Sequence, residues 1–150
     1  MTLTRPKNRH DQRGSAMTEL ALSVLLLMIA VTGVIEFARL FYTAAEVANA
    51  ARAGVEWGLV NPGSPNDLTA MQNAATTDAV NVSGMTATAS EFCQCDGGTS
   101  VSCTSGTCPT GQALRTYVKV VTSAAYTPLG SYWWMPSTTT INSQATIRVD

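Results

Sequence analysis

Histidine is almost absent from this sequence of 150 residues, and this scarcity limits the chemistry that the chain can perform. The single histidine, His10, lies in a basic segment at the N-terminus. A Ser-His-Asp triad or a Cys-His pair needs an imidazole as its general base. The acidic residues in the rest of the chain are scattered, without the spacing of a catalytic pair. The sequence therefore predicts no enzyme, no catalytic residue and no cofactor.

Basic residues are also scarce beyond position 14. Residues 15–150 hold five basic side chains against nine acidic ones, a net charge of −4. Because such a surface repels phosphate backbones, we expect no nucleic-acid partner. The first 14 residues differ, since they contain four basic side chains and one acidic one. Under the positive-inside rule, this leader suits the cytoplasmic flank of a membrane segment.

Charge is missing altogether between Leu20 and Ile35. Residues 15–35 carry Glu19 as their only charge, and a helix of this length spans about 31 Å, enough to cross the hydrocarbon core of a membrane. Residues 36–58 keep apolar or small residues at three-to-four spacing, which predicts that the same helix continues as an amphipathic outer half. The leader, residues 1–14, lacks apolar periodicity and is predicted to be disordered.

Residues 59–150 have the pattern of a small exported α+β domain. Residues 67–80 predict a short helix, with Asn66 or Asp67 as its N-cap. Strands are predicted at 86–95, 114–127 and 138–149, and a Gly/Ser/Thr-rich loop at 96–111. The predicted fold class is therefore α+β: a long N-terminal transmembrane and amphipathic helix packed on a small β-rich domain with a disulfide-stapled loop.

All four cysteines, Cys93, Cys95, Cys103 and Cys108, lie within this loop or at its edge. A zinc site is one interpretation, although the paired C-x-x-C spacing of zinc ribbons is missing. Two disulfides are the more natural cross-links in a small exported domain, and we predict no metal. Cys93 and Cys95 are too close to pair comfortably, which leaves two connectivities. A nested hairpin favours Cys93–Cys108 with Cys95–Cys103.

The junction between the leader and the apolar run carries the main functional signal. It reads Arg13-Gly14-Ser15, with Glu19 four residues further on. A carboxylate inside a membrane helix is costly unless a cation lies nearby, and a cut after Gly14 would create one, the α-amino group of Ser15. The junction resembles the processing site of type IV prepilins, which a prepilin peptidase cuts after a glycine on the cytoplasmic side.

The sequence beyond this site resembles the N-terminal signature of the TadE-like family, the minor pilins or pseudopilins of tight-adherence (Flp) pili. The matching elements lie within residues 13–58: Gly14, Glu19-Leu20-Ala21-Leu22, Gly33–Phe37 and Ala50–Gly54. One departure is Ser23-Val24, which stands where the family often has a proline.

The resemblance implies a structural role in the assembly, priming or capping of a pilus. It also implies a single-pass inner-membrane protein with a cytoplasmic N-terminus and an outer, periplasmic C-terminal domain. The implied partners are the prepilin peptidase, other pilins, the pilus assembly platform and membrane lipid.

The sequence leaves several alternatives open. The N-terminus could be a secretory signal peptide or an uncleaved signal anchor, although its helical periodicity continues well past the apolar run. The chain could be a membrane-tethered binding domain that never enters a filament and uses the cysteine loop or Trp133-Trp134. These tryptophans could equally belong to the core. Glu36 and Arg39 could form a solvated i,i+3 pair or contact a neighbouring subunit.

Overall fold

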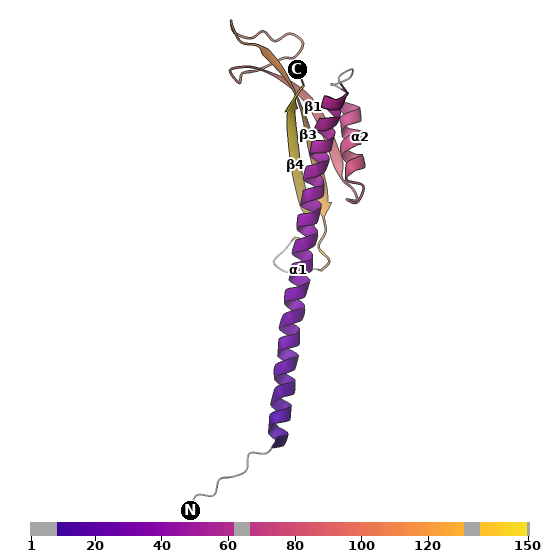
Figure 1. Cartoon of the computed structure of the whole chain (residues 1–150). Helices are drawn as coiled ribbons and strands as arrows, with labels where there is room; N and C mark the ends of the chain where they lie inside the picture. The colour runs from indigo at the N-terminus through magenta and orange to yellow at the C-terminus, as the bar shows by residue number, and fades with distance from the viewer. Residues whose placement is uncertain (1–8, 62–66, 131–135, 150) are drawn as a thin grey trace, which may run out of the picture. The chain divides into compact units, whose positions relative to one another are not determined.

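The computed structural model describes residues 9–61, 67–130 and 136–149. The chain forms two compact units, Met1–Arg39 and Leu40–Asp150. Its elements, labelled in Figure 1, are α1 (Arg9–Val60), α2 (Leu68–Asp78), β1 (Thr86–Cys95), β2 (Ser100–Val101), β3 (Leu114–Tyr126) and β4 (Thr139–Arg148). The predicted α+β class is confirmed.

Helix α1 is longer than the sequence pattern suggested. Residues Arg9–Gly14 are helical, so the expectation of a disordered leader is wrong for this part of it. None of these residues is a proline, and adding residues to an existing helix is far easier than starting one. At its other end α1 passes the predicted stop at Gly58 and ends at Val60, just before Asn61-Pro62, where a proline disfavours helical backbone in the preceding residue.

The second unit is built on a four-stranded antiparallel sheet with the order β2-β1-β3-β4. The three long strands lie where the alternating sequence predicted them, and Asp67 caps α2 by accepting a hydrogen bond from the Ala70 N–H at 2.9 Å. The short β2 lies in the segment that was expected to be all loop. Its two residues, Ser100 and Val101, are too few to show a strand pattern.

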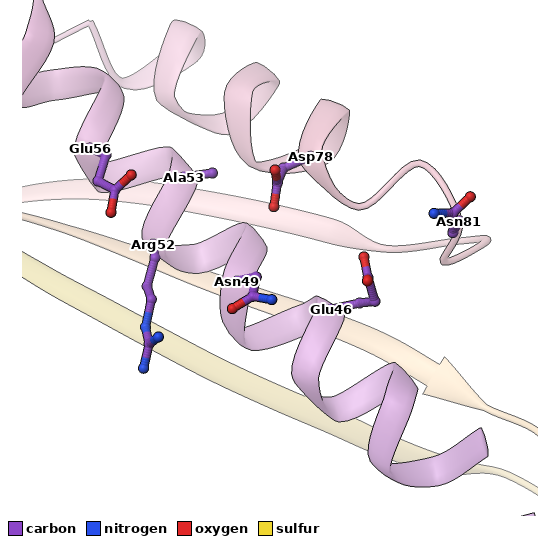
Figure 2. A pocket seen from close by; sticks show the side chains of 7 residues that line it. All are labelled: Glu46, Asn49, Arg52, Ala53, Glu56, Asp78 and Asn81. Carbon is purple, nitrogen blue, oxygen red and sulfur yellow. The ribbon is translucent and has the colours of Figure 1, made fainter. Parts of the chain in front are cut away.

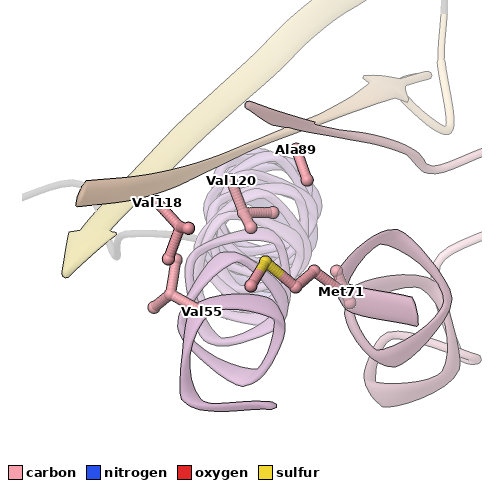
Figure 3. Packing of buried hydrophobic residues seen from close by; sticks show 6 residues of the cluster. Val55, Met71, Ala89, Val118 and Val120 are labelled. Carbon is pink, nitrogen blue, oxygen red and sulfur yellow. The ribbon is translucent and has the colours of Figure 1, made fainter. Parts of the chain in front are cut away.

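Both helices of this unit pack on one face of the sheet. Alternation along β3 directs Val118 and Val120 toward Val55 of α1 and Met71 of α2, and these side chains form the core with Ala89 (Figure 3). All five are buried, and α1 also buries Val47 and two alanines, Ala50 and Ala51, with Trp57 at the edge of the core. Small side chains allow close packing of the helix but leave little apolar volume in the core.

Gly54 marks the tightest approach of α1 to its neighbours. A Cβ atom at this position would lie 3.0 Å from Val120 Cγ1 and 3.1 Å from the carbonyl oxygen of Met71. A larger residue would force the elements apart. The glycine therefore permits the observed helix–sheet distance.

A buried hydrogen bond also joins α1 to the sheet. Thr122 Oγ1 on β3 donates to the backbone carbonyl of Val47 on α1 at 2.7 Å, and neither residue is exposed to solvent. Such a bond stabilises the fold by about 1 kcal/mol net, and its direction restricts sliding of the helix along the strand.

Two disulfides connect the end of β1 to the loop after it. They join Cys93 to Cys103, with Cα atoms 5.1 Å apart, and Cys95 to Cys108, with Cα atoms 5.6 Å apart. The prediction of two disulfides is confirmed. The nested pairing that the sequence favoured, Cys93–Cys108 with Cys95–Cys103, is wrong.

The register of β1 and β2 explains the observed pairing. Cys93 lies opposite Val101, and Cys95 donates its backbone N–H to the carbonyl of Thr99. Cys103 is therefore two residues beyond the partner of Cys93 but four beyond the partner of Cys95. Four strand residues span about 13 Å, whereas the Cα atoms of a disulfide lie within about 7 Å.

Candidate processing and assembly site

The N-terminal half of α1 exposes apolar side chains around its whole circumference. An 18-residue window has a mean hydropathy of 2.4, and 6% of it is buried. The exposed side chains include Leu20, Leu22, Leu25, Leu26, Leu27 and Ile29. A helix that is apolar on every side and not buried by protein is typical of a membrane span. It is the one candidate span within the part of the chain that the structure describes, and it is long enough for a single-pass anchor.

Three hydroxyl groups in this segment, those of Thr18, Ser23 and Thr32, are bonded within the helix. Thr18 donates to the carbonyl of Ser15 at 2.8 Å, Ser23 to that of Glu19 at 2.8 Å, and Thr32 to that of Ile29 at 2.9 Å. Polar groups in lipid must find partners internally. These hydroxyls therefore need no outside partner.

The carboxylate of Glu19 differs from these three hydroxyl groups. Its side chain is exposed, and within residues 9–61, 67–130 and 136–149 its carboxylate has no hydrogen bond or ion pair. It is also the only charged residue between Gly14 and Glu36. When lipid or protein excludes water from this position, the Glu19 carboxylate needs a cation that the described residues do not provide.

Gly14 lies a little more than one turn before Glu19, and no packing contact requires it to be a glycine. A Cβ atom added at position 14 would have no neighbour within 4 Å, in contrast to the close contacts found at Gly54. The residue is exposed and helical. Packing within the described residues therefore does not require a glycine at position 14.

Glu36 and Arg39 approach each other after the apolar segment, with Nη1 and Oε2 3.8 Å apart. The side chain of Arg39 is 43% exposed and that of Glu36 is 8% exposed. The sequence left open a fully solvated pair of Glu36 and Arg39. In the structure only the Arg39 side chain is substantially exposed, so the pair is partly solvated. A contact with a neighbouring subunit stays a prediction.

A family comparison covers this helix. Residues 14–56 match the family model described as TadE-like protein. This segment is TadE-like. The match begins at Gly14, includes Glu19 and Gly54, and stops before α2, consistent with a TadE-like pilin of the tight-adherence system. No curated protein and no solved structure matches the chain.

The sheet domain lies outside the TadE-like segment and carries a cross-linked loop. Asp96 accepts hydrogen bonds from Arg115 Nε at 2.8 Å and from the Ala113 N–H at 3.2 Å. These two bonds hold the pKa of Asp96 below its ordinary value. Together with the disulfides, they tie both ends of the loop to the sheet.

The alternative of a zinc site does not fit the cysteine chemistry. Ligand atoms of Glu91, Cys93 and Cys103 lie within 4.8 Å of one another. However, the two sulfur atoms are bonded to each other, and Cys95 and Cys108 form the second disulfide. Zinc binds thiolates, which these disulfides do not supply.

The structure leaves one predicted site untested, and it shows one cluster that the sequence analysis did not identify. Trp133 and Trp134 lie outside the described residues, so their role as core or binding patch stays a prediction. Sequence reasoning also missed a cluster of basic residues on the sheet. The alternation Arg115-x-x-x-Lys119 within β3 was the available signal, since it places both side chains on one face.

Proposed function

We propose that the chain is a minor pilin or pseudopilin that a prepilin peptidase cuts between Gly14 and Ser15, and that takes part in the assembly, priming or capping of a tight-adherence type IV pilus. The observation that carries the proposal is the pairing of Gly14, which packing does not require, with Glu19, which has no partner within the described residues. Both lie in an exposed apolar helix whose sequence is TadE-like.

Cleavage would supply the cation that Glu19 lacks. Ser15 and Glu19 stand at i and i+4 in α1, so they share one face of the helix. Hydrolysis of the neutral peptide bond between Gly14 and Ser15 consumes one water molecule, and it leaves a carboxylate on the released Gly14 and an ammonium group on Ser15. In a dry environment, a charge-assisted hydrogen bond from this group to Glu19 of the same or a neighbouring subunit is stronger than a surface ion pair.

The glycine also makes the site easier to cut. A peptidase acts on extended backbone, yet position 14 is helical in this chain. Glycine is less favourable than alanine inside a helix by about 1 kcal/mol, so the helix opens more readily there. This gives Gly14 a role that packing does not.

The remaining parts of the chain agree with this location and role. The basic leader favours a cytoplasmic N-terminus, and the disulfides favour an oxidising compartment for the sheet domain. In this arrangement the apolar half of α1 contacts lipid first and other pilins or the assembly platform afterwards. The role is structural and requires no catalytic group.

The intact mass of the protein recovered from membranes tests the proposal. With the prepilin peptidase co-expressed, we expect a chain that begins at Ser15, and without it a chain that keeps residues 1–14. Gly14→Leu should block the cut, whereas Gly33→Leu, also in the apolar helix, should not. A chain that keeps its leader in the presence of active peptidase would contradict the proposal and favour a membrane-tethered binding domain.

A further inference from the structure

The face of the sheet that points away from the helices carries a cluster of cations. Arg115, Tyr117 and Lys119 alternate on this face of β3, and the register places Arg148 of β4 opposite Tyr117. Phe92 of β1 stacks on Tyr117, with ring centroids 5.4 Å apart. Three of the four basic residues of Leu40–Asp150 thus lie together, and we name them, with Tyr117, the basic sheet face.

None of the described strand positions places a carboxylate on this face. Its remaining side chains are threonine, serine, asparagine, glutamine, valine and alanine. Asp96, in the turn after β1, neutralises part of the charge through Arg115. Lys119 has no ion pair within the described residues, so its positive charge is available to a partner.

The helix side of the same domain carries the opposite charge. A groove of about 570 Å³ between α1 and α2 is lined by Glu46, Asn49, Arg52, Ala53, Glu56, Asp78 and Asn81 (Figure 2). The guanidinium group of Arg52 extends away from α2 in this view. Within the described part of the chain, none of the three carboxylates has an ion-pair partner. We name these residues the helix groove.

We propose that the helix groove of one copy of this chain docks on the basic sheet face of a second copy. Lys119 on the sheet face and the three carboxylates of the groove have no ion pair within the described residues, and the two surfaces lie on opposite sides of the sheet. The domain as a whole is negative, so two copies would repel each other unless their charges were segregated in this way. A second copy offers each surface the charge that it lacks.

Such an interface is heterologous, because it joins two different surfaces. Each added copy leaves one groove and one sheet face open, so the contact extends into a filament or closes into a ring. The inference goes beyond the proposed function. Insertion of the apolar half of α1 into a pilus does not need this contact, and the contact does not need the cut after Gly14.

Lys119 makes the contact directly testable, since it is the only lysine beyond the leader. Full-length protein is prepared in unlabelled and 15N-labelled forms, mixed in liposomes and treated with a carbodiimide, which couples a lysine to a carboxylate in direct contact. We expect mixed-isotope peptides that join Lys119 to Glu46, Glu56 or Asp78. The link cannot form within one copy, because the sheet separates these residues.

Charge variants establish whether the attraction is the proposed one. Glu56→Lys should lower the yield of the Lys119 cross-link by about fivefold or more, and Thr69→Lys, on α2 outside the groove, should not change it. Combining Glu56→Lys with Lys119→Glu should restore a mixed-isotope link, now from position 56 to position 119.

Three results would overturn the inference. One is the absence of mixed-isotope links from Lys119, and another is a set of links to carboxylates outside the groove. The third is binding of polyglutamate to the basic sheet face without any link between copies, which would assign this face to an anionic polymer. Loss of leader cleavage alone would leave the cross-links in place and would count only against the proposed processing.

Discussion

Gly14 and Gly54 lie in one helix, but only Gly54 is required by packing within the described residues. A side chain at position 14 would meet open space, whereas one at position 54 would meet Val120 and the backbone of Met71. The TadE-like match includes both residues. The sequence suggested a role for Gly14 from its place before an apolar run, but it could not reveal the packing role of Gly54, which depends on contacts with distant elements.

Replacing Gly54 with leucine should destabilise the sheet domain. The new side chain would collide with Val120 and with the carbonyl of Met71, and overpacking of this kind costs about 1–3 kcal/mol. The expected result is a lower melting temperature by circular dichroism of the detergent-solubilised protein. Gly33→Leu is the matched control, because nothing lies within 4 Å of a Cβ atom there. Equal melting temperatures for both variants would contradict the packing role.

Glu19→Gln should separate processing from assembly. The peptidase acts around Gly14, so we expect the variant to be cut and to stay in the membrane. Once the helix is surrounded by other helices, the new α-amino group would lack its charged partner, and leaving a charge unpaired in a dry site costs several kcal/mol. The measurement is the amount of pilus in sheared fractions beside the ratio of cut to uncut chain. Normal piliation would show that the carboxylate has no part in assembly.

At the level of elements, hydrophobic periodicity predicted the long helix and the three long strands. It failed where the signal was short or absent: at β2, which has two residues, and at the start of α1, where polar residues continue an existing helix. The disulfide pairing failed for a different reason. The choice of partner for Cys93 depends on the register of β1 against β2, and the loop sequence does not encode that register in any simple pattern.

The cross-linked loop yields a direct prediction about connectivity. Proteolysis of the unreduced protein followed by mass spectrometry should recover peptides that join Cys93 to Cys103 and Cys95 to Cys108. Closing loops of this size should add about 2–4 kcal/mol to the stability of the domain, so reduction should lower its melting temperature. Four alkylated thiols in the unreduced protein would refute the prediction, as would the nested pairing.

At the scale of the whole molecule, the linear motifs were predictable and the surfaces were not. Gly14, Ser15 and Glu19 stand close together in the sequence, so one helix positions all of them. The helix groove combines Glu46 and Glu56 of α1 with Asp78 of α2, and only the packing of the two helices brings them together. The net charge of the chain likewise does not reveal that acidic residues gather in this groove and basic residues on the sheet face, because that separation depends on the fold.

The most direct test of the central claim is the form in which the chain occurs in filaments. Pili are sheared from cells that express the peptidase and the assembly proteins, and the intact mass of this chain in the filament fraction is measured. A subunit role predicts that the fraction contains the chain and that it begins at Ser15, in small amounts relative to the main pilin. Absence of the chain from filaments, with the protein found only in membranes and still carrying residues 1–14, would contradict the account.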